Sequence, residues 1–208
     1  MIATKMANLS ESITMKISAL AKKLKSEGVD ILSFSAGEPD FDTPDRIKDA
    51  AIEAIKGGKT KYTAVAGITE LKTAICEKLK RDQGLAYNPN QIIVSCGAKH
   101  SIFNVMMAML NPGDEVIVPA PYWVSYPEQT KLCGGVPVII ETTQEQGFKI
   151  TPSQLEVAIT PRTKLLVLNS PSNPTGSVYN REELNAIAEI LQKNSHCKIM
   201  SDEIYEKI

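Results

Sequence analysis

The feature that most constrains this chain is a series of short apolar segments in its second half, separated by turns and by helix signals. The segments are QIIVS, EVIVPA, VPVIIE, KLLVLNS and KIMSDE, at residues 91–95, 115–120, 136–141, 164–170 and 198–203. Runs of β-branched residues and leucine that alternate with helices are typical of parallel strands buried on both faces. The sequence therefore predicts an α/β fold whose parallel sheet is covered by helices on both sides.

Helical spacing of apolar residues predicts three helices before the first strand and others after it. The residues expected to bound the first three are Ser10 or Ser12 and Gly28, then Thr43, Pro44, Gly57 and Gly58, then Gly84. The stretch AKHSIFNVMMAML, at residues 98–110, is apolar nearly all round and predicts a buried helix. Asn180 and Glu183 have the spacing of a capping box that opens a later helix. With no repeat or clean linker, we expect one α/β domain with an N-terminal extension.

Composition excludes several classes of function. The 208 residues are 43% hydrophobic with a net charge of −1, which is ordinary for a soluble globular protein and favours neither nucleic acid nor an anionic membrane. The four cysteines form no C-x-x-C pair and only two histidines are present, so we expect reduced thiols and no metal site. No apolar run approaches the roughly 18 residues of a membrane span, and the N-terminus lacks a signal-peptide core. We therefore expect a cytoplasmic protein.

Ligands of open parallel sheets bind beyond the carboxyl ends of the strands, and two such ends carry candidate binding residues. In SCGAKH, Gly97 permits a tight turn, and the amides of Ala98 and Lys99 begin a helix where an anion can bind. The alternative is an ordinary strand-to-helix turn. In PAPYWVSYPE, Trp123 can stack on a flat ring, although most tryptophans are simply large core residues.

Two further strand ends carry polar side chains. In NSPSNPTG, two prolines fix the backbone where Asn173 can point its amide into a cleft, and the alternative is a merely rigid loop. Asp202 lies at the tip of an apolar strand, where a carboxylate is costly unless it meets a cation such as a protonated ring nitrogen. Otherwise Asp202 is the N-cap of a following helix.

Taken together, these segments resemble the fold-type I pyridoxal-phosphate enzymes, specifically class I aminotransferases of the aspartate and aromatic aminotransferase group. The resemblance rests on FSAGEPDFDTPDRI, GKTKYTAVAGITELKTAI, VSCGAKHSIFN, PAPYWVSYPE, NSPSNPTG and SDEIY, in family order from about residue 10 to the end. It implies the three-layer, mostly parallel sheet of the family's large domain. It also implies that residues 1–40 contribute to a small domain and that residues 41–208 are part of the pyridoxal-phosphate-binding large domain.

The resemblance implies a role for each matching residue. Gly97, Ala98 and Lys99 match the segment that binds the phosphate of pyridoxal 5'-phosphate, and Trp123 matches the aromatic residue stacked on its ring. Asp202 matches the carboxylate that keeps the ring nitrogen protonated, and Asn173 and Tyr205 match the pair bonded to the phenolic oxygen. The residues implied to contact the substrate are Gly37, Trp123 and Asn173. Tyr62 matches a tyrosine that reaches the phosphate in a neighbouring subunit, so a homodimer with shared active sites is implied.

Two residues of the family pattern have no match in this chain. The lysine that forms the imine with the cofactor lies a few tens of residues beyond SDEIY, and Lys207 is too close to Asp202 to fill that place. The arginine that binds the substrate carboxylate, nearer the family's C-terminus, is also missing. We therefore expect these residues to be the N-terminal part of an aminotransferase, inactive on its own.

Amino-group transfer between an L-amino acid and a 2-oxo acid is the leading expectation for function. Another reaction of the same scaffold, such as β-elimination from a sulfur amino acid by a C–S lyase, stays open because the fold does not decide the reaction. A non-catalytic truncated product is the third possibility. A dinucleotide-binding module is disfavoured, because no G-x-G-x-x-G follows any strand.

Overall fold

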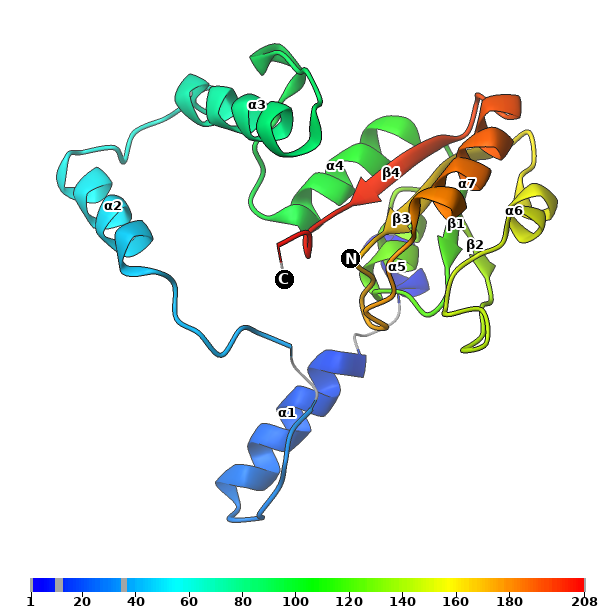
Figure 1. Ribbon diagram of the computed structural model, residues 1–208. Coiled ribbons are helices and arrows are strands. Elements are labelled where there is room, and N and C mark those ends of the chain that lie inside the picture. Colours follow the sequence, from blue (N-terminus) through cyan, green and yellow to red (C-terminus); the bar gives the residue numbers. More distant parts are fainter. Residues whose placement is uncertain (1, 10–12, 35–36, 208) are drawn as a thin grey trace. The chain divides into compact units, whose positions relative to one another are not determined.

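The computed structural model describes residues 2–9, 13–34 and 37–207, and the chain divides into two compact units. The first unit, residues 1–10 with 96–208, holds a four-stranded sheet, and the second, residues 11–95, holds three α-helices (Figure 1). Across the described parts of the chain, no helix is long and apolar enough to cross a membrane.

The sheet is parallel throughout, with the strand order β2-β1-β3-β4. Its strands are β1 (Glu115–Pro119), β2 (Val136–Ile140), β3 (Thr163–Asn169) and β4 (Lys198–Asp202). The register pairs Asn169 with Asp202, so the last residues of β3 and β4 lie side by side at the carboxyl edge. The predicted parallel α/β fold is confirmed, and its register places two polar side chains next to each other where ligands bind.

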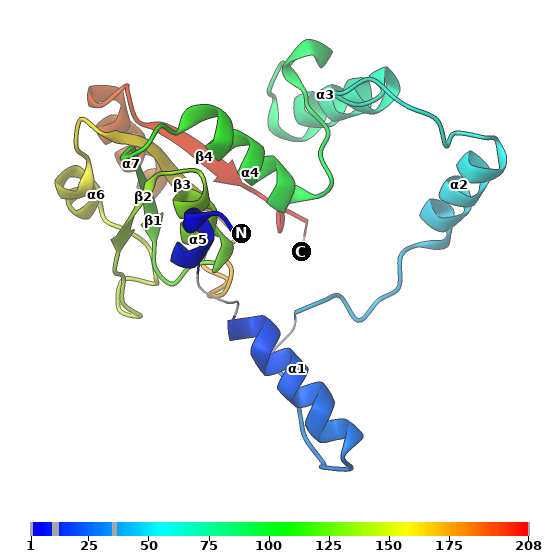
Figure 2. The same cartoon turned by 180° about the vertical axis from the view of Figure 1, so that it is seen from behind.

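Helices cover both faces of this sheet (Figure 2). They are α4 (Ala98–Met109), α5 (Ser125–Leu132), α6 (Pro152–Ala158) and α7 (Arg181–Lys193), and the short 3-10 helix η1 (Thr4–Asn8) contacts α5. Val116 of β1 packs in one core with Met106 of α4, while Ile117 packs in the other with Leu155 of α6 and Ile187 of α7. Successive residues of a strand point to opposite faces, so β1 contributes to both cores.

The second unit contains α1 (Ile13–Ser26), α2 (Asp45–Lys56), α3 (Thr69–Gln83) and the 3-10 helix η2 (Pro89–Gln91). These three α-helices lie where they were predicted, and Gly84 ends α3 with a left-handed φ of 70°. Thr43 is not the N-cap of α2, because Pro44 itself occupies that position with an extended backbone. The predicted caps of α1, Ser10 and Ser12, lie outside the described residues.

The predictions for the segment QIIVS and for helix α4 are also wrong. The segment QIIVS is not a strand: Gln91 ends η2, and residues 92–95 have no strand partner among the described residues. A strand exists only where a neighbour completes its hydrogen bonds, and Val94 N donates instead to Ala66 O at 3.1 Å. Helix α4 is also not buried all round. It buries Ile102 and Met106 against the sheet, while its other face carries exposed apolar residues such as Met107.

Candidate functional site

The carboxylate of Asp202 lies at the carboxyl edge of the sheet and is held by two donors. Tyr126 Oη of α5 donates to Asp202 Oδ2 at 2.7 Å, and Ile204 N donates to Oδ1 at 3.2 Å. Tyr126 is buried, and its burial raises the pKa of the phenol, to which the hydrogen bond to Asp202 adds. Tyr126 is therefore a permanent donor that orients the carboxylate and leaves part of its acceptor capacity free.

The strand that carries Asp202 differs from the prediction. We expected a buried strand with apolar surroundings, but β4 is at the edge of the sheet, and Lys198, Ile199 and Ser201 are exposed while Met200 is buried. Asp202 itself is half-buried. The carboxylate thus remains accessible to a ligand from the open side and is stabilised by hydrogen bonds from within.

A second hydrogen-bonded pair lies in the same part of the sheet edge. Asn173 Nδ2 donates to Tyr205 Oη at 3.0 Å, which joins the loop after β3 to the segment after β4. Asn169, the last residue of β3, holds the backbone of Asn173, because its Oδ1 accepts from Asn173 N at 2.7 Å. Its Nδ2 donates to Asp202 O at 3.0 Å. The amide of Asn173 and the phenol of Tyr205 therefore present polar atoms beside Asp202.

The N-terminus of α4 provides positive charge near these groups. Gly97 precedes the helix with φ 84°, and no side chain of the described residues caps the helix. The Lys99 ammonium lies 4.9 Å from the centroid of the Trp123 ring, a cation–π contact. Trp123 in turn meets Tyr126 edge to face, with ring centroids 5.4 Å apart. A continuous series of contacts thus connects Lys99 through Trp123 and Tyr126 to Asp202.

The structure brings together seven of the nine residues singled out from the sequence. Gly97, Ala98, Lys99, Trp123, Asn173, Asp202 and Tyr205 all belong to the sheet unit. Gly37 and Tyr62 belong to the unit of residues 11–95, so their expected contacts with substrate and phosphate stay predictions. Tyr62 is fully exposed within that unit.

Sequence reasoning missed Tyr126, and it singled out the segment that Asn169 opens without giving that residue a role. Tyr126 lies inside the motif PAPYWVSYPE, three residues after Trp123, which is the spacing at which side chains of a helical turn share a face. The short helix α5 was not predicted, so that spacing carried no signal. Asn169 is the last residue of an apolar strand, and its role depends on the register with β4.

These groups fit pyridoxal 5'-phosphate by the chemistry of their donors and acceptors. Uncapped amides at the start of α4 and the Lys99 ammonium suit a phosphate. The Asp202 carboxylate suits a protonated ring nitrogen, and Asn173 Nδ2 with Tyr205 Oη suits a phenolic oxygen. Around Gly97, a Cβ would meet no atom within 4 Å, so the turn before α4 has room for a bound group.

Comparison with curated proteins gives close relatives that are longer than this chain. The chain is 55% identical over 208 residues to an aspartate aminotransferase of Bacillus sp. (strain YM-2), covering 100% of this chain and 53% of that protein. It is 54% identical over 203 residues to an aspartate/prephenate aminotransferase of Cereibacter sphaeroides, covering 98% and 51%. The chain thus spans about half the length of these relatives.

Solved structures give the same result for the fold. The aspartate aminotransferase of Thermus thermophilus with maleate matches with a TM-score of 0.95 at 48% identity, over 99% of this chain and 54% of that one. The aspartate aminotransferase from Rhizobium meliloti matches with a TM-score of 0.95 at 47% identity, over 99% and 52%. The fold is that of the pyridoxal-phosphate-dependent aspartate aminotransferases, whose family works with this cofactor. The family model for aminotransferase class I and II matches residues 29–208, and the chain belongs to that family.

Proposed function

We propose that this chain serves in a pyridoxal-phosphate-dependent aminotransferase that moves an amino group from an L-amino acid to a 2-oxo acid. The observation that carries the proposal is the arrangement at the carboxyl edge of the sheet. There, a carboxylate oriented by Tyr126 lies beside the hydrogen-bonded pair of Asn173 and Tyr205. A carboxylate for a ring nitrogen and two polar groups for a ring oxygen are what this cofactor requires of its protein.

When bound, pyridoxal phosphate supplies a protonated ring that accepts the electron pair left at the substrate α-carbon. Asp202 keeps the proton on the ring nitrogen, since its negative charge favours the cationic form. Tyr126 Oη and Ile204 N occupy one acceptor position on each carboxylate oxygen and fix its direction.

The remaining residues bind and orient the cofactor. The amides of Ala98 and Lys99 and the Lys99 ammonium would bind the phosphate, while Trp123 would cover the ring and exclude water from one side of it. Asn173 and Tyr205 would direct their polar atoms to the phenolic oxygen, and Trp123 and Asn173 would contact the substrate. The substrate contact of Gly37, in the helical unit, stays a prediction. Residues that hold the phosphate, the ring nitrogen and the phenolic oxygen would together fix the orientation of the cofactor, which favours reaction through positioning.

We further propose aspartate as an amino donor, because the relatives named above are an aspartate aminotransferase and an aspartate/prephenate aminotransferase. The test uses the protein as its gene encodes it, supplied with pyridoxal phosphate. Aspartate and 2-oxoglutarate should give oxaloacetate and glutamate, and prephenate in place of 2-oxoglutarate tests the second acceptor. Pyruvate release from a sulfur amino acid, with no 2-oxo acid required and no oxaloacetate from aspartate, would contradict transamination and favour the β-elimination reaction.

A homodimer with shared active sites belongs to the same proposal. The fully exposed Tyr62 of the helical unit supports it, because an aromatic side chain without cover is suited to a site completed by a second subunit. The cytoplasm is the proposed location, and the four free cysteines are consistent with a reducing compartment. Light scattering of the purified protein should give twice the mass of one chain, and Tyr62→Phe should weaken cofactor binding without changing that mass.

A further inference from the structure

The loop that carries Asn173 is closed by its own hydrogen bonds. We call residues 170–179 the Asn173 loop. Gly176 N donates to Ser172 O at 2.8 Å, Ser172 N donates to Ser177 O at 3.0 Å, and Tyr179 N donates to Ser170 Oγ at 3.2 Å. These bonds make the loop a compact unit, so a displacement of its outer end at Ser177–Tyr179 is transmitted to Asn173.

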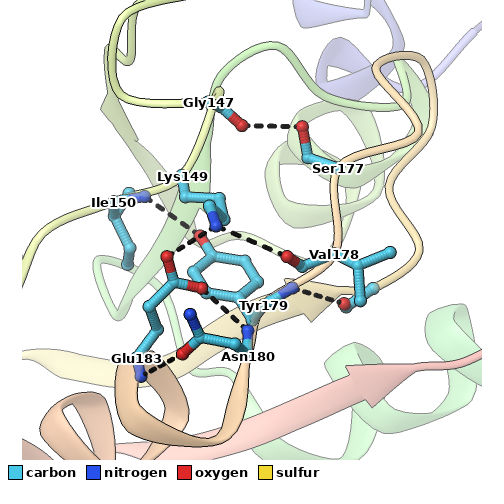
Figure 3. Close-up of polar contacts among 9 residues, drawn as sticks. Gly147, Lys149, Ile150, Ser177, Val178, Tyr179, Asn180 and Glu183 are labelled. Atoms are coloured by element: carbon cyan, nitrogen blue, oxygen red, sulfur yellow. Dashed lines mark hydrogen bonds and ion pairs between the residues drawn. The ribbon is translucent and has the colours of Figure 1, made fainter.

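The outer end of the Asn173 loop is attached to the segment that follows β2. Ser177 Oγ donates to Gly147 O at 2.7 Å, and Ile150 N donates to Tyr179 Oη at 3.0 Å. Lys149 Nζ pairs with Glu183 Oε1 of α7 at 2.5 Å and lies 3.5 Å from Val178 O (Figure 3). We call Lys149, Tyr179 and Glu183 the clamp. Figure 3 shows their side chains converging between the segment that follows β2 and the end of the Asn173 loop.

The clamp is shielded from water more than a typical surface ion pair. The side chains of Lys149 and Glu183 are 22% and 34% exposed, and the pKa of Glu183 is lowered, first by Lys149 and then by the Asn180 amide. Tyr179 is 8% exposed, and its burial raises the pKa of its phenol, which stays neutral. Ion pairs at this level of burial are screened less by solvent than exposed pairs, whose contribution is small.

The Asn173 loop borders a small cavity, so part of its surface has no packing partner among the described residues. The cavity lies at the carboxyl ends of β1 and β3, and its lining includes Ser172 and Asn173 on one side and Phe148 and Tyr179 on another. The loop is held at its two ends, by Asn169 at the inner end and by the clamp with its buried Tyr179 at the outer end.

We propose that the clamp is a positioning assembly for Asn173. It holds the amide of Asn173 where it meets Tyr205 and, in the loaded protein, the phenolic oxygen of the cofactor. The contact with Tyr205 rests on the structure alone, and the contact with the cofactor rests on the proposed function. Lys149 and Glu183 touch neither reacting group, so their effect is exerted through Asn173.

The test compares Lys149→Met with a matched variant at the opposite end of the sheet. Lys149→Met removes the ion pair and keeps most of the side chain's apolar length, and Lys149→Arg restores the charge. Arg162→Met breaks the ion pair between Arg162 and the buried Glu115. Glu115 is at the amino-terminal end of β1, whereas Asn173 follows the carboxyl end of β3. Each Met variant loses one ion pair with a carboxylate. If Lys149 contributed only to general stability, both variants would therefore change the site to the same extent.

Two readouts on the protein as its gene encodes it decide the matter. Without cofactor, hydrogen exchange of the Gly176 amide should become at least about tenfold faster in Lys149→Met and recover in Lys149→Arg, with Arg162→Met unchanged. With pyridoxal phosphate, the pH midpoint of the cofactor's absorbance change should rise by about 0.5 to 1 unit in Lys149→Met only. That is the size of effect expected when one hydrogen bond to a charged oxygen weakens.

Equal effects of Lys149→Met and Arg162→Met, or no effect of Lys149→Met on either readout, would overturn the positioning role. If the unaltered protein fails to bind pyridoxal phosphate, the proposed function fails instead. The exchange rate of Gly176 then decides the clamp by itself, since that measurement needs no cofactor. Glu183→Gln provides a second check, because it retains an acceptor for the Asn180 amide, removes the charge, and should reproduce the effect of Lys149→Met.

Discussion

At the scale of single residues, we expect Asp202 to supply the charge and Tyr126 to fix the direction of its carboxylate. Tyr126→Phe removes the 2.7 Å donor and leaves the ring in place, so the carboxylate keeps its charge but loses its fixed direction. Loss of one hydrogen bond to a charged group costs about 1.5–3 kcal/mol. We expect kcat of the full enzyme to fall by roughly tenfold to a hundredfold, measured with aspartate and 2-oxoglutarate.

Asp202→Asn provides the comparison, because an amide cannot hold a ring nitrogen protonated by its charge. Its loss in kcat should exceed that of Tyr126→Phe by at least about tenfold, the rate ratio that corresponds to 1.4 kcal/mol of transition-state stabilisation. Equal losses in the two variants would show that orientation, and not charge, is the contribution of Asp202.

The residues of the site differ in how well the sequence predicts them. Asn173 and Asp202 follow apolar runs and lie in segments of unusual polar composition, so the sequence alone singles them out. Trp123 stands out as the single tryptophan. Tyr126 carries no such signal, because a tyrosine on a short helix is common. Asn169 opens the polar segment NSPSNPTG, but no pattern in the sequence assigns it a role. Their roles arise from the packing of α5 on the sheet and from the β3–β4 register, which are properties of the tertiary structure.

At the scale of elements, local signals predict the long helices and fail for short ones and for pairing. The capping box of α7 forms as predicted, with Asn180 Oδ1 accepting from Glu183 N at 2.8 Å. Helix α6 has its own capping box, in which Thr151 Oγ1 accepts from Gln154 N at 3.2 Å, but with seven residues it shows little periodicity. The apolar pattern of QIIVS is that of a strand, and the missing strand partner is a property that periodicity does not contain.

The exposed edge of β4 leads to a prediction about this element. Only β3 pairs with β4 among the described residues, and the exposed Ile199 lies on this edge strand. Unpaired strand edges with apolar side chains promote association between chains, and lysine on an edge opposes it. Ile199→Lys should therefore reduce concentration-dependent light scattering of the 208-residue chain. Met200→Lys is no substitute, because Met200 is buried in the core.

An unchanged scattering profile in Ile199→Lys would show that association proceeds through another surface. The exposed apolar residues of α2, including Ile47 and Ile55, are the next to examine. A double substitution there separates the two surfaces, since α2 belongs to the other unit.

At the scale of the whole molecule, a buried carboxylate links β1 to the start of β3 at the amino-terminal ends of these strands. Glu115 of β1 is 5% exposed and accepts hydrogen bonds from Thr160, Arg162 and Thr163, residues at or just before β3. The hydrogen bond from Thr160 is the main cause that lowers the pKa of Glu115 below 4.5, with smaller contributions from Arg162 and Thr163 and with burial opposing them. The charged form of Glu115 thus stabilises the folded unit.

The sign of the pH dependence follows from that lowered pKa. Well above pH 4.5 Glu115 is ionised in both states, and the folded state has the full benefit of its hydrogen bonds. As the pH falls below 4.5, the unfolded chain takes up the proton first, so the free energy of unfolding decreases until the folded carboxyl is also protonated. Glu183, whose pKa is lowered as well, contributes in the same direction.

Urea unfolding of the 208-residue chain, followed by fluorescence of its single tryptophan, measures this dependence in the sheet unit. Glu115→Gln should be less stable than the unaltered chain at pH 7, and the difference should shrink as the pH falls through the lowered pKa of folded Glu115. The free energy of unfolding of Glu115→Gln should also vary less steeply with pH. The slope is set by the number of protons taken up on unfolding, and one carboxyl can change that number by at most about one. Parallel curves for the two chains would show that Glu115 does not titrate differently in the folded and unfolded states. The acid sensitivity of the sheet unit would then have to come from other carboxylates whose pKa is lowered, such as Glu183.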